Sequence, residues 1–387
     1  MNIFIITTTR ADFGLLKNLV QEFKKNKIYT KIIAGGTHFS KNFGNTYDEI
    51  KYSKIKLYKK IIINSKFNNS IDISFVINKH LTEITKIFNK SKPDLMIILG
   101  DRYEMLSAAI ACHISGVPIA HIHGGEVTAG VVDDAFRHSI TKMSHIHFVA
   151  NKIYKNRVVQ LGENPKNVFV TGGLGVDSIK NTKLFNKKQI EKKLSIKFCK
   201  KNIIINFHPE TLNKKKSKSQ LNELLKALKT LKDTCFIFTG PGADAENIII
   251  KRIIKKFIDK TDNAYYFNSL GQKNYLSILK LVDCMLGNSS SGLLEMPTFK
   301  KASINIGIRQ KGRIKSLSVI DSKIKKIDII KSINKIYSKK FTKTLKISKN
   351  PYGPPGASKK IVNIIKKYNF KSILEKNFYD LKLRNYK

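Results

Sequence analysis

The stretch Gly287-Asn288-Ser289-Ser290-Ser291-Gly292-Leu293-Leu294-Glu295 follows an apolar strand candidate at Asp283 to Leu286 and leads into an expected helix. A small polar loop at such a junction leaves backbone N–H groups unpaired, and the positive end of the helix dipole points beyond the sheet. This arrangement favours a diphosphate. The serine hydroxyls can cap the helix, and Glu295 follows closely enough to accept hydrogen bonds from a ribose diol. An ordinary serine-capped helix start explains the same residues equally well.

The run from Asp283 to Leu286 belongs to a series in which short apolar runs alternate with helical patterns. Strands that alternate with helices form parallel sheets with helices on both faces. The chain is therefore predicted to be α/β, with two doubly wound, Rossmann-like domains joined in the lysine-rich stretch from about 175 to 200. The expected strands lie at 2–7, 30–34, 95–99, 117–122, 146–149 and 167–171 in the first half, and at 202–206, 234–239, 263–267, 282–286 and 303–306 in the second.

The length of the chain also favours two domains. At 387 residues it exceeds what one hydrophobic core usually fills, and its 42% of hydrophobic residues can supply two cores. We expect an N-terminal domain at residues 1–180 and a C-terminal domain at 181–358. Two such domains would leave an inter-domain cleft at the carboxyl ends of their strands, where ligands of these folds bind.

Several features of the sequence bear on where in the cell the protein is expected. The most apolar long stretch, 105–122, is interrupted by polar residues and does not read as a membrane span. The sequence starts with an apolar strand candidate and lacks the basic region of a signal peptide, so a cytoplasmic location is expected. The four cysteines lie far apart without a Cys-x-x-Cys pair, so neither a zinc site nor a disulfide framework is indicated.

The formal net charge of +44 raises nucleic acid as a partner, because clustered cations bind phosphates. The lysines, however, are spread over nearly every expected helix, without a focused stripe or interleaved aromatic residues. A solvated lysine-rich surface explains this distribution better, so we expect no nucleic-acid partner. Attraction to anionic substrates or membrane surfaces stays open.

Polar residues follow the expected strands of both halves. Asp101 and Arg102 follow the strand at 95–99, and His123 and Glu126 follow the next one. Each has an ordinary explanation, because an Asp after a strand is often a turn residue or a helix cap, and a lone His is often structural. Further candidates of this kind are Arg10, Asp133, His208, Glu210 and Asp244, and Asp134 with Arg137 and His138 could be a solvated helix pair. Together these groups suit acid/base chemistry on a nucleotide-linked substrate.

Seven motifs occur in an order that characterises one enzyme family. They are Thr-Arg-Ala-Asp-Phe-Gly at 9–14, Gly-Asp-Arg-Tyr-Glu at 100–104, His-Ile-His-Gly-Gly-Glu at 121–126, Asp-Asp-x-x-Arg-His at 133–138, Phe-His-Pro-Glu-Thr at 207–211, Gly-Asn-Ser-Ser-Ser-Gly at 287–292 and Asn-Ile-Gly-x-Arg-Gln-x-Gly-Arg at 305–313. The set resembles the hydrolysing UDP-N-acetylglucosamine 2-epimerases of bacterial sialic acid synthesis. The resemblance implies a glycosyltransferase-B type fold whose final helices, at about 359–387, pack back on the N-terminal domain.

The resemblance also implies a reaction: elimination of UDP across C1–C2, then hydration of the 2-acetamidoglucal to N-acetylmannosamine. Asp101 and Asp133 match catalytic carboxylates of the family. Many relatives carry a Glu at the position of His123, so this chain departs from them, and either His123 or Glu126 could be the base. His208, Ser289 and Ser290 would hold the diphosphate, Arg10, Arg102 and Arg309 would complement UDP, and Glu295 would bind the ribose. The chemistry implies no metal or nicotinamide cofactor, and the family's assemblies make a homo-oligomer expected.

Three alternatives stay open. The nearest is a hydrolysing 2-epimerase of UDP- or GDP-linked N,N'-diacetylbacillosamine on the way to legionaminic acid, which would use the same catalytic residues. A non-hydrolysing epimerase would return a UDP-sugar, although the Gly-Gly-Glu and Phe-His-Pro-Glu motifs argue against it. A glycosyltransferase would share the fold and the diphosphate loop, but it would not need carboxylates that serve both faces of C2.

Overall fold

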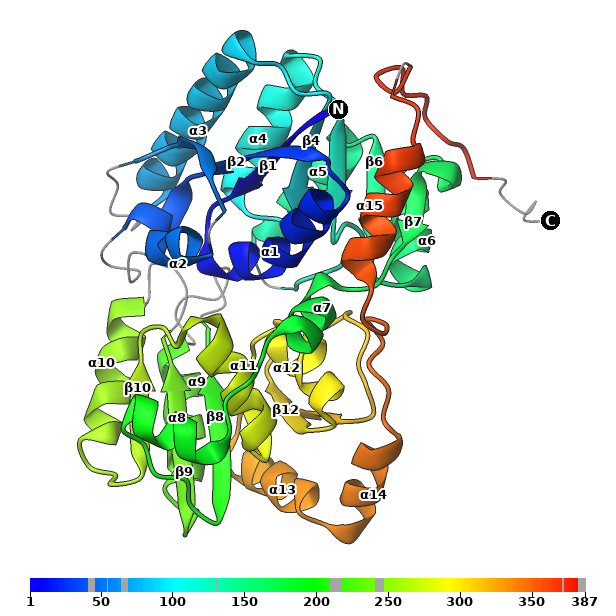
Figure 1. The fold of residues 1–387 in the computed structure, drawn as a ribbon. Helices are drawn as coiled ribbons and strands as arrows, with labels where there is room; N and C mark the ends of the chain where they lie inside the picture. The colour runs from blue at the N-terminus through cyan, green and yellow to red at the C-terminus, as the bar shows by residue number, and fades with distance from the viewer. Residues whose placement is uncertain are drawn as a thin grey trace, which may run out of the picture. The chain divides into compact units, whose positions relative to one another are not determined.

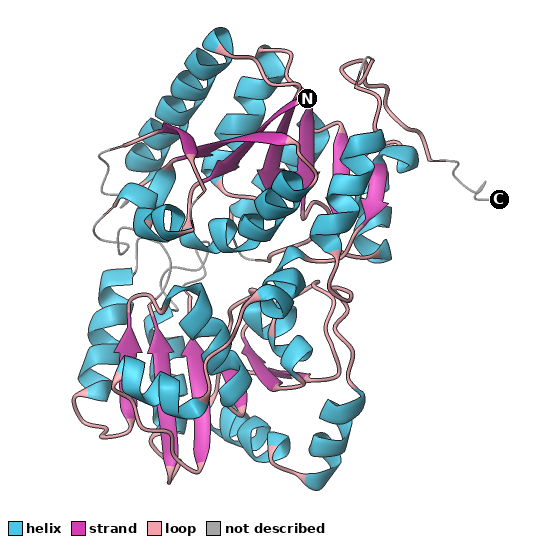
Figure 2. Cartoon of the chain, viewed as in Figure 1, coloured by secondary structure: helices cyan, strands magenta, loops and turns pink. Residues whose placement is uncertain are grey.

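The structure, a computed structural model, describes residues 1–40, 46–53, 55–63, 69–129, 131–208, 217–240, 247–370 and 372–381. The chain divides into two compact units. Unit 1 consists of Met1–Glu126, Asp133–Ser178 and Tyr352–Lys387, and unit 2 consists of Val127–Val132 and Ile179–Pro351. Each unit is an α/β structure built on a parallel sheet (Figure 2), which confirms the fold class that the sequence predicts.

Unit 1 contains a seven-stranded parallel sheet with the order β3-β2-β1-β4-β5-β6-β7 among its described residues (Figure 1). Its strands are β1 (Asn2–Thr7), β2 (Tyr29–Ala34), β3 (Leu57–Lys60), β4 (Leu95–Leu99), β5 (Ile119–Ile122), β6 (Ile146–Val149) and β7 (Val168–Val170). Its helices are α1 (Arg10–Lys25), α2 (Tyr47–Tyr52), α3 (Ser70–Lys90), α4 (Tyr103–Ile114), α5 (Asp133–Met143), α6 (Lys152–Gln160) and α15 (Ala357–Lys367), and α7 (Leu174–Asn181) starts in this unit.

The two faces of this sheet are covered by different helices because successive side chains of a strand point to opposite faces. On β1, Phe4 and Ile6 pack in one buried cluster with residues of α3 and α4. The alternate residues Ile3 and Ile5 pack in a second cluster with residues of α1 and α15. Burial of each such side chain contributes about 1.5–3 kcal/mol, so both helical layers are fixed by the strand's apolar alternation.

Unit 2 contains a six-stranded parallel sheet with the order β10-β9-β8-β11-β12-β13 among its described residues. Its strands are β8 (Lys201–Asn206), β9 (Thr234–Thr239), β10 (Ala264–Phe267), β11 (Cys284–Gly287), β12 (Ala302–Ile306) and β13 (Val319–Ser322). Its helices are α8 (Lys187–Leu194), α9 (Ser217–Leu228), α10 (Asn247–Ile258), α11 (Gly271–Leu281), α12 (Ser291–Leu294), α13 (Lys326–Ile336) and α14 (Lys339–Ile347).

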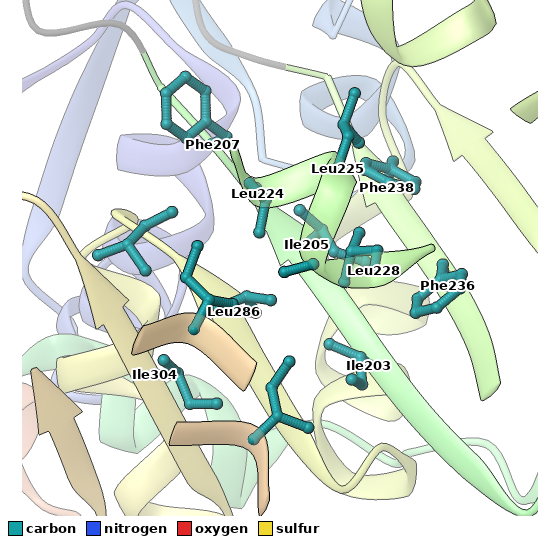
Figure 3. Packing of buried hydrophobic residues seen from close by; sticks show 14 of the residues in the cluster. Ile203, Ile205, Phe207, Leu224, Leu225, Leu228, Phe236, Phe238, Leu286 and Ile304 are labelled. Atoms are coloured by element: carbon teal, nitrogen blue, oxygen red, sulfur yellow. The ribbon is translucent and has the colours of Figure 1, made fainter. Parts of the chain in front are cut away.

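The core of unit 2 has the same two-faced design. Ile203 and Ile205 of β8 pack with Leu224 and Leu228 of α9 in one buried cluster (Figure 3). Ile204, which lies between them in the strand, belongs to a second buried cluster with residues of α8 and α11. The continuous apolar sequence of β8 therefore reflects burial on both faces, as expected for a central parallel strand.

The end of the chain differs from the helices expected up to about residue 387. α15 packs against α1 in unit 1, but it ends at Lys367, and residues 368–370 and 372–381 form no helix. Tertiary hydrogen bonds fix this segment instead: the Tyr379 N–H donates to the Gly162 carbonyl at 2.9 Å, and the Lys376 ammonium contacts the Glu163 carboxylate at 2.7 Å. None of the helices that the structure describes has the length and apolar character needed to cross a membrane.

Candidate functional site

In unit 1, the candidate residues lie at the carboxyl ends of β1, β4 and β5, which are neighbours in the sheet. The strand order reverses between β1 and β4, and ligands of doubly wound sheets bind at such a point. After β1, the Asp12 carboxylate accepts from the Thr9 N–H at 2.8 Å and the Thr9 hydroxyl accepts from the Asp12 N–H at 3.3 Å, which forms a capping box at the start of α1. Arg10 is the first residue of that helix, so this turn determines its place.

After β4, Arg102 is held by a buried carboxylate. Its Nε and one terminal nitrogen donate to the two Glu104 oxygens, both at 3.0 Å, and the Glu104 side chain is fully buried. Burial acts to lower the pKa of Arg102, but the charges of Glu104 and Asp133 are among the influences that raise it well above its ordinary value. The guanidinium is therefore a fixed positive charge at the strand end, and Asp133 lies close enough to act on it electrostatically.

After β5, His123 adopts a left-handed backbone conformation with φ of 68°. Residues other than glycine uncommonly adopt this backbone conformation, which costs energy and occurs often at functional sites. The His123 Nδ1 lies 2.9 Å from an oxygen of the buried Glu126 carboxylate. Its Nε2 is buried and has no hydrogen-bond partner among the described residues. The ring is thus oriented through one nitrogen by Glu126, while the other nitrogen is available to a ligand.

Arg137 of α5 joins these strand ends. Its side chain is almost fully buried, and it donates to the carboxylates of Asp101 and Asp134 and, at 3.0 Å, to the Glu126 carbonyl. The helix pair of Asp134 with Arg137 that the sequence allows is present, but it is not a solvated pair on the Arg137 side, because that guanidinium is buried. The buried guanidinium instead fixes Asp101 relative to the segment that carries His123 and Glu126.

His121, in contrast, has a structural role. Its Nε2 donates to the Gly100 carbonyl at 2.8 Å and its Nδ1 lies 3.1 Å from the Thr141 hydroxyl. Complete burial lowers the pKa of His121 to about 3, against a smaller opposite effect of the Gly100 hydrogen bond. A neutral His121 therefore connects the ends of β4 and β5 to α5.

In unit 2, the candidates lie at the carboxyl ends of β8 and β11, where that sheet also reverses its strand order. Asn288 follows β11 and is fully buried. Its side-chain oxygen accepts from the His208 N–H and its side-chain nitrogen donates to the His208 carbonyl, each at 2.7 Å. Its own carbonyl accepts from Arg309 at 3.1 Å. The structure thus brings His208, Ser289 and Arg309 together around Asn288.

The imidazole of His208 is neutral in this setting. Desolvation and then the positive charge of Arg309 lower the pKa of His208 to about 3. A neutral ring donates a hydrogen bond through one nitrogen and accepts through the other. Of these two residues, Arg309 rather than His208 therefore carries a positive charge that an anionic ligand could meet.

The helix that follows the serine loop is shorter than the sequence suggests. α12 is a single turn of four residues, its N-cap Ser290 makes no side-chain capping bond, and the Ser289 hydroxyl is 3.4 Å from the Ser291 N–H. The expected helix dipole is therefore weak, because a macrodipole needs several aligned turns. Ser289 and Ser290 are partly exposed, so their hydroxyls rather than a long helix are the groups this loop presents. Glu295 lies directly after α12.

Some candidates lie outside the described residues, namely Glu210 and Asp244, together with Pro209 and Thr211 of the motif at 207–211. The sequence did not identify Glu104, Asn288 and Gln310, whose side chains or backbone hold the candidate residues in place. Their only signal in the sequence is that they lie within the motifs that contain Asp101, Ser289 and Arg309. Within the described part of the chain, no group of three or more His, Cys, Asp or Glu side chains could hold a metal ion.

Comparison with known families shows which family the chain belongs to. Residues 21–366 match the family model described as UDP-N-acetylglucosamine 2-epimerase. The chain belongs to this family. Three curated relatives span nearly its whole length. They are the GDP/UDP-N,N'-diacetylbacillosamine 2-epimerase (hydrolyzing) of Campylobacter jejuni, 43% identical over 98% of this chain and 99% of the relative; the polysialic acid biosynthesis protein P7 of Escherichia coli, 37% identical over 98% and 97%; and the UDP-N,N'-diacetylbacillosamine 2-epimerase (hydrolyzing) of Legionella pneumophila, 30% identical over 94% and 95%.

Solved structures show that the epimerase has the expected fold. The UDP-GlcNAc 2-epimerase of Neisseria meningitidis bound to UDP-GlcNAc is similar with a TM-score of 0.80, at 19% identity, covering 95% of this chain and 100% of that one. The Methanocaldococcus jannaschii enzyme in complex with UDP-GlcNAc and UDP is similar with a TM-score of 0.78, at 19% identity, covering 95% and 99%. The epimerase therefore shares the two-domain, glycosyltransferase-B type architecture that the motifs predict. The family model and the curated relatives, not these structures, support its membership of the hydrolysing 2-epimerases.

Proposed function

We propose that this epimerase hydrolyses nucleotide-linked N,N'-diacetylbacillosamine and releases the free sugar inverted at C2 together with the nucleoside diphosphate. The relatives from C. jejuni and L. pneumophila are both described by this substrate, and each is aligned over almost all of this chain. They support this substrate over UDP-N-acetylglucosamine, which the sequence motifs alone favour.

The reaction places clear demands on the protein. A base removes the C2 proton, and the electron pair of that bond forms the C1=C2 double bond as the C1–O bond breaks. The bonding electrons leave with the nucleoside diphosphate. Water then adds its oxygen to C1, and C2 receives a proton on the opposite face. Inversion therefore needs proton-transfer groups on both faces of the sugar and stabilisation of the departing diphosphate.

Unit 1 would supply the proton-transfer groups, and the observation that carries this assignment is the His123–Glu126 pair. Glu126 orients the imidazole through a 2.9 Å contact to Nδ1, and the buried Nε2 has no partner among the described residues. We therefore assign base chemistry to the His123 Nε2 and an orienting, charge-stabilising role to Glu126. Asp101 and Asp133 would act as the further catalytic carboxylates, with Arg102 and Arg10 as cationic groups towards the nucleotide sugar.

Unit 2 would bind the leaving group. His208, Ser289, Ser290 and Arg309 gather at its strand ends and offer hydroxyl, imidazole and guanidinium donors to a diphosphate. Such donors lower the barrier when they point to the place where negative charge develops. Glu295, which follows α12, is the proposed partner of the ribose hydroxyls.

A substrate panel tests the proposal. Purified protein is incubated separately with UDP- and GDP-linked N,N'-diacetylbacillosamine and with UDP-N-acetylglucosamine, and release of the nucleoside diphosphate is measured. We expect the highest kcat/KM with a diacetylbacillosamine nucleotide, and Asp101→Asn serves as the inactive control. No release from either diacetylbacillosamine nucleotide would overturn this substrate assignment.

UDP-N-acetylglucosamine is the second candidate, because the family model that this chain matches over residues 21–366 is described by that substrate. The same catalytic groups would then yield N-acetylmannosamine and UDP. Preferential turnover of UDP-N-acetylglucosamine in the panel would establish this alternative.

The reaction type is tested separately from the substrate. In heavy water, elimination and hydration place one solvent deuterium at C2 of the released sugar, which mass spectrometry and proton NMR detect. A glycosyl transfer leaves the C2 hydrogen in place. A product without deuterium at C2 would therefore contradict the elimination mechanism, whichever sugar nucleotide is used.

A further inference from the structure

Asn288 makes hydrogen bonds to several other segments of unit 2 through its backbone and its side chain. It follows β11 directly, its N–H donates to the Asn206 carbonyl at 3.1 Å, and its side chain is fully buried. It therefore continues the pairing of β11 with β8 for one residue beyond the strand. At this position its side chain is directed at the chain that leaves β8.

The Asn288 amide pairs with both polar groups of His208. Its oxygen accepts from the His208 N–H and its nitrogen donates to the His208 carbonyl, each at 2.7 Å. Only a primary amide of this length both donates and accepts in this way, because a carboxylate cannot donate and an alcohol is too short to reach both groups. The backbone of His208 is thus fixed without a strand partner.

The Asn288 carbonyl contributes a second connection. It accepts from Arg309 at 3.1 Å and from the Gln310 amide at 2.8 Å, and Gln310 is itself fully buried. One residue therefore links three segments that are far apart in the sequence: the end of β8, the serine loop and the segment after β12. Each of these segments carries at least one of the groups assigned to the diphosphate.

We propose that Asn288 is the positioning residue of the nucleotide site: it sets the places of His208, Ser289 and Arg309 and so determines affinity for the diphosphate of the leaving nucleotide. The inference rests on the proposed function, because it takes the diphosphate as the ligand of these three residues. Asn288 itself acts through its neighbours, since its amide and its carbonyl are both occupied by protein groups.

Unit 2 contains a matched control for a purely structural role. At the opposite, amino-terminal end of β8, the Asn202 side-chain oxygen accepts from the Cys199 N–H at 2.9 Å and its nitrogen donates to the Cys199 carbonyl at 3.0 Å. Asn202 is also buried. The two asparagines therefore make the same amide-to-backbone pairing, Asn202 with the chain that enters β8 and Asn288 with the chain that leaves it, and only Asn288 lies at the proposed site.

The test compares Asn288→Asp with Asn202→Asp in the full-length protein. In either variant the donor nitrogen becomes an oxygen that faces a carbonyl, so both should lower the thermal midpoint. Binding of UDP and UMP is then measured by isothermal titration calorimetry, with GDP in parallel. We expect Asn288→Asp to bind UDP roughly ten- to a hundredfold more weakly, with a smaller loss for UMP, while Asn202→Asp binds both like the wild type.

The possible results of these binding measurements distinguish a failure of the positioning role of Asn288 from a failure of the proposed function on which it rests. If the wild type binds UDP and Asn288→Asp binds it within about twofold, or if Asn202→Asp loses as much affinity, the positioning role is refuted. If the wild type binds neither UDP nor GDP, the proposed function and this inference fall together. Should Asn288→Asp not fold, Gln310→Met removes one hydrogen bond to the Asn288 carbonyl and is expected to weaken UDP binding roughly three- to tenfold, and unchanged binding contradicts the proposal.

Discussion

Asp101 is the residue at which a single change of charge is most informative. Asp101→Asn keeps an oxygen that can accept from Arg137 but removes the negative charge and the capacity for proton transfer. We expect kcat to fall by about two to four orders of magnitude, with UDP affinity unchanged because the groups proposed to bind the diphosphate lie in unit 2. Steady-state kinetics and calorimetry measure both quantities.

Asp94 is the control for this change, since it lies just before β4, at the opposite end of the strand that leads to Asp101, and is largely exposed. Asp94→Asn should therefore retain normal kcat. Near-normal turnover of Asp101→Asn would show that its carboxylate takes no part in the chemistry.

The His123–Glu126 pair leads to a prediction about rank order. His123→Gln removes the proposed base and should lower kcat by about two to four orders of magnitude. Glu126→Gln leaves the imidazole in place and removes one charge-assisted hydrogen bond, so a smaller loss of roughly ten- to a hundredfold is expected. Kinetics of both variants decide which group is the base, because the reverse order would assign that role to Glu126.

A second buried His–Glu pair in unit 1 serves as a control for the loss of such a contact away from the site. The His147 Nε2 lies 2.9 Å from the Glu163 carboxylate, also in unit 1. Glu163→Gln should lower the thermal midpoint while leaving kcat unchanged. A drop in kcat equal to that of Glu126→Gln would mean that both effects arise from a loosened unit rather than from the site.

The residues that the sequence could identify are those whose chemical type is unusual at a strand end. Asp101 and His123 each have an ordinary explanation alone, but they stand out because such groups follow several neighbouring strands and lie within ordered motifs. Arg137 and Asn288 do not stand out, since a helical Asp-x-x-Arg spacing and an Asn in a turn are common at any surface. Their burial and their partners distant in sequence, on which their roles depend, are not encoded in local spacing.

At the level of elements, apolar runs predicted the central strands well because those strands are buried on both faces. β3, with the sequence Leu-Tyr-Lys-Lys, escaped prediction since an edge strand exposes most of its side chains. The helix expected after the serine loop, at residues 291–296, is present but ends earlier, at Leu294. Pro297 follows it closely, and the chain continues as a 3₁₀ helix at Met296–Phe299, so the apolar pattern after Ser290 has no long helix to form.

The junction between β11 and the serine loop depends on Gly287. Its φ is 149°, and a Cβ there would lie 2.0 Å from the Asn206 carbonyl oxygen. Because that neighbour is backbone of the adjacent strand β8, it cannot move aside cheaply. We expect Gly287→Ala to reduce the free energy of unfolding by about 2–4 kcal/mol and to weaken UDP binding, as measured by urea denaturation and calorimetry.

Gly292 provides the comparison for this substitution. It lies in α12 with an ordinary φ, and a Cβ there would meet the Ser303 hydroxyl at 3.3 Å. Gly292→Ala should therefore change stability by about 1 kcal/mol or less. Equal losses for the two variants would show that the close approach to β8 is not what requires glycine at 287.

For the whole molecule, the pH dependence of stability follows from buried histidines that the sequence could not distinguish from exposed ones. Complete burial lowers the pKa of His121 to about 3, and burial lowers the pKa of His145 to about 4. In the unfolded chain both would titrate near 6.5. Between those values the unfolded state binds more protons than the folded state, so acidification favours unfolding.

His121 alone should therefore account for a loss of about 1.4 kcal/mol in the free energy of unfolding between pH 7.5 and pH 5.5, because over this range the unfolded chain binds on average about half a proton more at this residue than the folded protein does. The measurement is urea denaturation followed by circular dichroism, since the chain contains no tryptophan. His121→Gln, although less stable at pH 7.5, should lose about 1.4 kcal/mol less than the wild type over the same range. His113→Gln, which changes an exposed histidine of α4, should retain the wild-type dependence. A wild-type slope in His121→Gln would show that His121 is not neutral in the folded protein at pH 5.5.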